Sequence, residues 1–197
     1  MRWRRFKSIV ASDLFRHSGV ISTRVFWRHF LWTPGFRYVY MLRLYAYART
    51  HRWASFGFRQ FVSVTLHRYS IRYGISISPD TRIGSGFYIG HFGGIVVNTD
   101  VVIGNNCNLS QDVTLGQINR GPKAGCPIIG DHVYIGPGAK IIGRILVGDH
   151  AAIGANAVVV DDVPSSTAVG GIPARVISDK GSDGYVNRTD YPPVLTD

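Results

Sequence analysis

A six-residue period constrains this chain more than any other feature. Between Ile77 and Val159 an aliphatic residue recurs at every sixth position in three series whose phase shifts twice. A period of six fits neither an amphipathic helix nor an alternating strand, and repeats must be recognised before elements are assigned. The fourteen aliphatic positions are Ile77, Ile83, Ile89 and Ile95; Val97, Ile103, Leu109 and Leu115; and Ile129, Ile135, Ile141, Val147, Ile153 and Val159.

The period predicts a parallel β-solenoid in which three six-residue units form one triangular coil. Glycine follows eight of the fourteen aliphatic residues, where a corner benefits from its backbone freedom. Four residues after members of the third series come small or β-branched residues, which we also expect inside: Val133, Ala139, Ile145, Ala151 and Ala157. Cys107 falls at an inward position as well, so we expect a core residue rather than a nucleophile.

Residues 1–73 have a helical period, and they precede a β-solenoid over 74–177 and an irregular C-terminal extension over 178–197. Capping signals predict one helix that opens at Ser12-Asp13 and ends at Gly19, and a second from Ser22-Thr23 to Pro34. Two further helices are expected over 36–50 and 58–74.

The net charge of +10 is concentrated in the helical segment. Residues 1–73 carry 13 Arg and one Lys against a single acid, Asp13, and they hold 18 of the 24 aromatic residues. This composition is typical of helices that lie at an anionic membrane surface. The alternative is a helical cap that packs on the solenoid and on neighbouring subunits. No nucleic-acid recognition motif accompanies the charge, so we expect no nucleic-acid partner.

The location in the cell is predicted from cysteine usage and hydropathy. The two cysteines, Cys107 and Cys126, follow no pairing pattern, which favours a reducing compartment. No signal-peptide core or apolar run of spanning length is evident. We therefore expect a cytoplasmic protein, and the basic helical segment favours peripheral attachment to the inner face of the bacterial cytoplasmic membrane.

Two interruptions of the repeat predict where a site is built. The phase slips by two residues after "GHFGG" (90–94), and a polar Gly/Pro-rich loop, 117–127, separates Leu115 from Ile129. His91 lies in the first interruption, and we expect it to face a groove that the loop also borders. An imidazole there suits a general base that takes a proton from a hydroxyl; the alternative is a structural turn histidine.

The stretches "GFYIGHFGGIVV", "LSQDVTLG", "IGDHVYIGPGAKIIG" and "GGIPARVI" carry a family resemblance. Residues 74–177 resemble the hexapeptide-repeat acyltransferases with a left-handed parallel β-helix, most closely the serine O-acetyltransferase branch, which includes many polysaccharide O-acetyltransferases. The resemblance implies acetyl-CoA as co-substrate without a metal, His91 as general base, and a homotrimer with CoA sites between subunits. It implies CoA contacts from Gly116, Gly136, Pro137, Lys140, Ala155, Pro173 and Arg175.

The chain departs from the serine-specific pattern at three positions. Ser76 stands where the family has the Asp that orients the histidine, Gly90 stands where it has Asp, and Cys126 stands where it has His before Pro. A zwitterionic acceptor needs charged partners, so we expect a sugar hydroxyl in bacterial surface polysaccharide as acceptor. The residues expected to bind the acceptor or orient His91 are Ser76, Asn108, Gln111, Asp112 and Cys126.

Three alternatives remain at this point. The first is a serine or other small-molecule O-acetyltransferase. The second is a zinc hydratase on the same β-helix, which requires three clustered histidines; His91, His132 and His150 lack that spacing. The third is a non-catalytic β-helix that binds a membrane.

Overall fold

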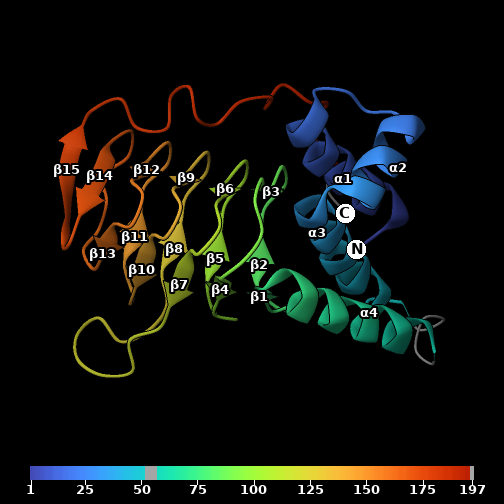
Figure 1. The fold of residues 1–197 in the computed structure, drawn as a ribbon, viewed down its shortest axis with the longest axis horizontal. Coiled ribbons are helices and arrows are strands. Elements are labelled where there is room, and N and C mark those ends of the chain that lie inside the picture. Colours follow the sequence, from blue (N-terminus) through green and yellow to red (C-terminus); the bar gives the residue numbers. More distant parts are fainter. Residues whose placement is uncertain (52–56, 196–197) are drawn as a thin grey trace.

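The computed structural model describes residues 1–51 and 57–195. Four helices gather at one end, and a β-helix extends away from them (Figure 1). The helices are α1 (Trp3–Ser18), α2 (Thr23–Trp32), α3 (Pro34–Ala48) and α4 (Phe58–Tyr73). We call them the helical cap.

Three sheets form the walls of the β-helix. The first wall contains β1 (Ile75–Ile77), β4 (Ile95–Val97), β7 (Thr114–Gly116), β10 (Lys140–Ile142) and β13 (Val158–Val159). The second wall contains β2 (Arg82–Ile83), β5 (Val102–Ile103), β8 (Ile128–Ile129) and β11 (Leu146–Val147). The third wall contains β3 (Tyr88–Ile89), β6 (Asn108–Leu109), β9 (Tyr134–Ile135), β12 (Ala152–Ile153), β14 (Ala168–Gly171) and β15 (Ala174–Ser178). Every named pair is parallel except β14–β15, so the predicted β-helix with an N-terminal helical segment is confirmed.

The core of the β-helix is the set of positions that the six-residue period marks. All fourteen aliphatic residues except Ile83 are at most 5% exposed, and Ile83 packs partly buried against them. Val133, Ala139, Ile145, Ala151 and Ala157 are buried too. Complete burial of one such aliphatic side chain stabilises the folded chain by about 1.5–3 kcal/mol relative to leaving it exposed. Cys107 is a core residue as predicted: it is almost completely buried, and this burial raises the pKa of its thiol to about 12.

The first helix differs from its prediction. It begins at Trp3, and Ser12 and Asp13 lie inside it rather than at its N-terminus. Both side chains are buried and turned towards the first coil: Ser12 Oγ accepts a hydrogen bond from Gly86 N (3.0 Å). Asp13 Oδ1 accepts one from Phe87 N (2.8 Å). Ser12 and Asp13 are residue types typical of an N-cap, but here they accept hydrogen bonds from backbone amides of the first coil.

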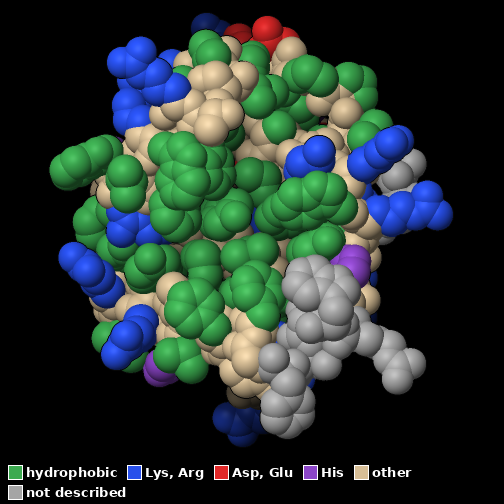
Figure 2. Space-filling model, turned by 90° about the vertical axis from the view of Figure 1, so that its right-hand side faces the viewer, with side chains coloured by type: hydrophobic (Ala, Val, Ile, Leu, Met, Phe, Trp, Pro, Cys, Tyr) green, Lys and Arg blue, Asp and Glu red, His purple; other side chains and the backbone are tan. Residues whose placement is uncertain are grey.

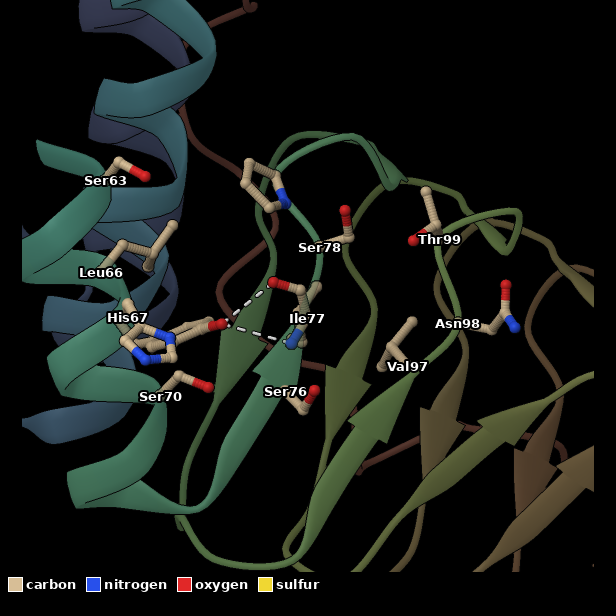
Figure 3. A pocket seen from close by; sticks show the side chains of 12 residues that line it. Ser63, Leu66, His67, Ser70, Ser76, Ile77, Ser78, Val97, Asn98 and Thr99 are labelled. Carbon is tan, nitrogen blue, oxygen red and sulfur yellow. Dashed lines mark hydrogen bonds between the residues drawn. The ribbon is translucent and has the colours of Figure 1, made fainter. Parts of the chain in front are cut away.

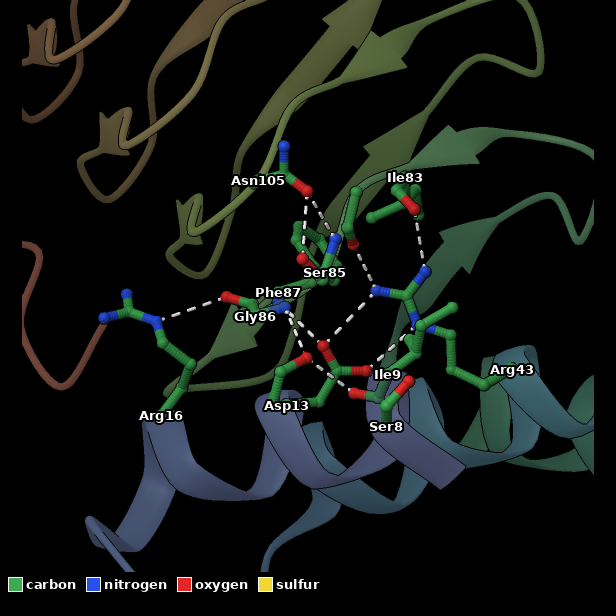
Figure 4. Close-up of polar contacts among 12 residues, drawn as sticks. Ser8, Ile9, Asp13, Arg16, Arg43, Ile83, Ser85, Gly86, Phe87 and Asn105 are labelled. Carbon is green, nitrogen blue, oxygen red and sulfur yellow. Dashed lines mark hydrogen bonds and ion pairs between the residues drawn. The ribbon is translucent and has the colours of Figure 1, made fainter. Parts of the chain in front are cut away.

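One buried ion pair fastens the helical cap to the β-helix (Figure 4). Arg43 Nε lies 2.9 Å from Asp13 Oδ2, and both side chains are nearly inaccessible to solvent. The same guanidinium donates to the carbonyl oxygens of Ile83 (2.8 Å) and Gly84 (2.5 Å). Because both charges and their remaining hydrogen-bonding groups are satisfied, the pair is compatible with burial.

The C-terminal extension is irregular but packed. It leaves β15 at the far end of the β-helix and returns along it to the helices (Figure 1). Tyr185 stacks on Tyr134 with ring centroids 4.6 Å apart, and Tyr191 Oη donates to Asn106 Oδ1 (2.7 Å). In the described part of the chain, no helix combines the length and apolar character that crossing a bilayer requires.

Candidate active site

His91 lies on an enlarged corner between the third and first walls. Ile89 pairs with Leu109 and Val97 pairs with Leu115. The chain takes eight residues to pass from Ile89 to Val97, but only six to pass from Leu109 to Leu115 in the next coil. The two extra residues push the corner outwards. His91 is exposed, and no hydrogen bond or ion pair joins its side chain to any described residue.

Contacts on both sides fix this corner. Ile95 N donates to Gly74 O (3.0 Å), and the Phe92 ring lies 5.7 Å from that of Tyr73 at the end of α4. Asp112 N donates to Gly93 O (2.8 Å) from the next coil. The amides of residues 91–94 donate to no other described residue, so they are available to a ligand oxygen.

Tyr88 borders the corner, and the sequence reasoning missed it. A Cβ placed on Gly90 would lie 2.9 Å from Tyr88 Cε1 and 3.1 Å from its Oη. The ring therefore occupies the space into which a side chain at position 90 would begin to project. The available signal was spacing: residues two apart in a strand share a face, so an outward Tyr at 88 covers position 90.

Most of the residues predicted to act in catalysis or to bind CoA lie along one edge of the β-helix. Strand register places the corners that carry His91, Gln111, Pro137 and Ala155 in successive coils, one above the next. Gly136 precedes Pro137 on this edge, and the β14–β15 turn that contains Pro173 ends it. We call this line the His91 edge. At about 4.8 Å per coil it extends roughly 19 Å from His91 to the turn.

Gln111 and Asp112 occupy the corner directly below His91. Gln111 Oε1 is buried without a hydrogen-bond partner among the described residues. Asp112 has a φ of +58°, and its carboxylate lies where a side chain on Gly94 would be. Asn156 sits over Gly138 in the same way, so this arrangement belongs to the corner architecture. The ammonium of Lys140 donates to the Asp112 carbonyl and thus lies beside the His91 edge.

Asn108 does not line the His91 corner as expected. It is 8% exposed, its Oδ1 accepts a hydrogen bond from Arg16 Nη2, and its Nδ2 donates to Tyr185 O (3.0 Å). The amide is thus committed to α1 and to the C-terminal extension. Its role is structural because it joins three segments that are distant in sequence.

Ser76 is exposed on the first wall and lines a hollow between α4 and the first coil (Figure 3). The hollow has a volume of about 390 Å³. Its wall includes the imidazole of His67 and the hydroxyls of Ser63, Ser70 and Ser78. Tyr38 Oη donates to Ile77 O (3.0 Å) at its base. Its polar lining consists of hydroxyls, one amide and one imidazole, and no carboxylate, lysine or arginine of the described residues lines it.

Loop 117–127 lies at the opposite edge of the first wall, which corrects the expected shared groove. Strands of this wall begin at the His91 edge and end at the corner where Gly116, the loop and Cys126 lie. Within one chain, the strand's length separates the loop from His91. The loop is anchored there: Lys123 Nζ donates to Val160 O (2.6 Å) and contacts Asp161, which lies 3.5 Å from Arg175 Nη1.

The three histidines weighed as a zinc site do not converge. The His132 and His150 rings stack 4.7 Å apart on the corner between the second and third walls. His91 lies on the corner between the third and first walls. Over the described residues, no group of three or more His, Cys, Asp or Glu side chains is placed to hold a metal ion.

Comparison with known proteins places the chain in a family. Residues 126–161 match the family model "Bacterial transferase hexapeptide (six repeats)". The serine acetyltransferase of Bacillus licheniformis is 40% identical over 126 residues, which are 63% of this chain and 58% of that protein. The chain spans about half the length of the curated relatives it matches, from 44% to 58%.

Solved structures extend the similarity to the helical cap. The crystal structure of serine acetyltransferase from Brucella abortus strain S19 has a TM-score of 0.73 and 30% identity, and the match covers 90% of this chain and 70% of that one. A complex of a Brucella abortus serine acetyltransferase with coenzyme A gives a TM-score of 0.70 at 30% identity, with 89% and 67% covered. The chain belongs to the hexapeptide-repeat transferase family, as the resemblance of residues 74–177 predicts.

The comparisons overturn the expected acceptor. The sequence departures favoured a sugar hydroxyl in surface polysaccharide, whereas the relatives and structures named above are serine acetyltransferases. The expectation rested on three changed positions. At one of them, Gly90, the ring of Tyr88 occupies the space beside the backbone.

Proposed function

We propose that this chain is an acetyl-CoA-dependent O-acetyltransferase whose acceptor is the side-chain hydroxyl of serine. The observation that carries the proposal is the exposed imidazole of His91, which has no hydrogen-bond partner among the described residues and lies on an enlarged corner of the β-helix. Similarity to serine acetyltransferases over both the β-helix and the helical cap supports the choice of acceptor.

In the proposed reaction, His91 takes the proton of the serine hydroxyl as the oxygen attacks the thioester carbonyl carbon of acetyl-CoA. A carbon–oxygen bond forms and the carbonyl oxygen gains the negative charge. The free amides of residues 91–94 are the donors nearest to the base for this oxyanion. When the carbon–sulfur bond breaks, the proton on His91 passes to the departing thiolate, which yields O-acetylserine and CoA.

The proposed path of CoA follows the His91 edge. Gly136, Pro137 and Ala155 give this edge small or flat side chains, against which an extended pantetheine chain can lie. Lys140 projects from the first wall beside it and supplies a positive charge for a phosphate. Arg175 is at the far end of the β-helix, with its guanidinium largely exposed, and is a second candidate for that contact.

We propose that the working form is a homotrimer. The support comes from the arrangement within one chain. His91 lies at one edge of the first wall, whereas Gly116 and loop 117–127 lie at its other edge. A site that uses both sets of residues therefore requires the loop edge of one copy to meet the His91 edge of another. Cys126, partly buried within that loop, then borders the acceptor only in the assembly.

The experiment that tests the function measures free CoA released from acetyl-CoA in the presence of L-serine. The panel of acceptors includes D-serine, L-threonine and L-alanine, the last of which lacks the hydroxyl. We expect turnover with L-serine and none with L-alanine. His91→Ala is expected to reduce kcat about 10²- to 10⁴-fold and to keep the wild-type circular dichroism spectrum, because the side chain is exposed and unpartnered. Absence of serine turnover, or full activity in His91→Ala, contradicts the proposal.

A further inference from the structure

Helix α2 has two aromatic faces, and only one is packed. Phe26 and Phe30 turn towards α3, where their rings lie 5.2 and 5.5 Å from that of Tyr40. Trp27 and Leu31, one position further along, are 53% and 56% exposed. No residue of α2 is fully buried. The helix therefore rests on the cap through one face and offers a second apolar face to its surroundings.

This apolar surface continues across the helical end of the molecule. Figure 2 shows hydrophobic side chains spread over that end, with Lys and Arg side chains among and around them. Besides Trp27 and Leu31, the exposed large apolar residues of α1, the α1–α2 connection, α2 and α4 are Trp32 (81%), Ile71 (72%), Phe61 (65%), Val64 (58%), Trp3 (52%), Val20 (52%), Ile21 (45%) and Phe58 (39%). A surface so rich in large apolar groups marks an interaction site.

Positive charge lies on the same face of α2. Arg24 and Arg28 are exposed, one turn apart, and neither forms an ion pair with a described residue. Asp13, the only acid of residues 1–73, is buried against Arg43 and offers no counter-charge. Arg24, Trp27, Arg28, Leu31 and Trp32 together are called the α2 face below.

An apolar groove adjoins the α2 face. It runs between α1 and the start of α2, has a volume of about 430 Å³, and is lined by Trp3, Phe6, Ile21 and Phe26 among others. Lys7 lies at this groove with its ammonium 5.8 Å from the centre of the Trp3 ring. An apolar groove of this kind can hold the acyl chain of a lipid, while the cation beside it contacts the anionic headgroup.

We propose that the α2 face binds the surface of a lipid bilayer that contains anionic lipids. Trp and Leu side chains enter the boundary between headgroups and acyl chains, and the arginines meet the headgroup charge. A second copy of this chain fits less well, because it brings the same unpaired positive charge to the contact. The helices and β15 lie at opposite ends of the molecule (Figure 1), so this docking holds the β-helix away from the membrane.

The test is co-sedimentation of the full chain with vesicles of phosphatidylcholine alone or with 30% phosphatidylglycerol. We expect binding to the anionic vesicles that weakens as salt is raised, and little binding to the neutral ones. Arg24→Gln/Arg28→Gln is expected to weaken binding about fivefold per arginine. Trp27→Ser/Leu31→Ser is expected to weaken it at least tenfold and to reduce quenching of Trp fluorescence by brominated lipids.

The matched control is Val176→Ser/Ile177→Ser, which removes two exposed apolar residues of β15 at the opposite end. It is expected to leave vesicle binding unchanged. Circular dichroism checks the fold of each variant. Equal binding to neutral and anionic vesicles, or no binding to either, overturns the proposal. A change of oligomeric state in the α2-face variants with vesicle binding intact assigns the face to contacts between copies and overturns it as well.

Discussion

In the β-helix, each coil buries side chains equivalent to those of its neighbours, whereas each contact between the helical cap and the first coil occurs once. Ile135 and Ile153 are interchangeable members of a series, and their strands pair in the same register. The other ion pairs among the described residues are exposed, so the buried Arg43–Asp13 pair has no counterpart in that part of the chain. Stability is therefore spread over many similar contacts in one region and concentrated in a few groups in the other.

The largest expected effect comes from removing one partner of the buried Arg43–Asp13 ion pair. Arg43→Met leaves the Asp13 carboxylate buried without its cation, so we expect a loss of about 3–5 kcal/mol in the free energy of unfolding. Urea unfolding measures it, and hydrogen exchange locates it. Protection should fall in α1 and α3 and persist in β9 and β12.

The control for this prediction is Asp13→Leu/Arg43→Met, which leaves no buried charge and should recover much of the loss. If Arg43→Met lowers protection equally in β9 and β12, the cap and the β-helix unfold as one unit. The contrast between concentrated and distributed stability would then be wrong.

A second test uses a close backbone approach between the two regions. Gly35 in α3 lies against β3, and a Cβ there would overlap the carbonyl oxygen of Ile89. Backbone cannot give way as a flexible side chain can, so Gly35→Ala is expected to cost about 1–3 kcal/mol. Gly170→Ala is the matched control, because its Cβ would meet only the end of the Ile177 side chain at 3.2 Å. Equal melting temperatures for the two variants contradict the prediction.

The pH dependence of the cap provides a third test. Burial lowers the pKa of His17 to about 3, with help from the charges of His29, Arg16 and Arg188. The unfolded chain binds this proton as pH falls below about 6.5, while the folded chain does not until about pH 3. Stability is thus present above pH 6.5 and lost towards pH 3.

Between pH 6.5 and pH 5, His17 is expected to remove up to about 2 kcal/mol of the free energy of unfolding. Urea unfolding at both pH values measures the change. His17→Gln should flatten the pH dependence over this range. A slope unchanged in His17→Gln would assign the acid sensitivity to other groups.

The sequence was sufficient to predict the repeating part of the structure because each inward position is supported by equivalent positions before and after it. One misjudged residue, such as Ile83 at the edge of the core, does not change the fold. The same pattern marked the His91 corner, since an interruption is visible only against a regular background. Counting three strands per coil would also have placed loop 117–127 at the opposite edge.

Contacts that occur once carry no such signal. Ser12 and Asp13 form a plausible N-cap in sequence, and only the folded chain shows that their partners are Gly86 and Phe87. Asn108 suggested a site residue through its position near the corner, yet Arg16 holds it from 92 residues away. Local patterns cannot specify which distant polar group will satisfy a buried one.

The smallest expected effect concerns Ser76, where the cap and the β-helix border the same hollow. In the resembled family an Asp at this position orients the catalytic histidine. Ser76 is exposed on a regular strand, so Ser76→Asp should fold normally. An exposed charge pair contributes about 0.2–1 kcal/mol, which corresponds to a rise of up to about fivefold in kcat with serine.

Ser76→Asn is the control, since it has similar size without the charge. A gain in Ser76→Asp alone would show that His91 lacks an orienting carboxylate in the natural chain. An equal change in both variants would mean that its orientation already comes from the corner itself, through the contacts of Gly93 and Phe92.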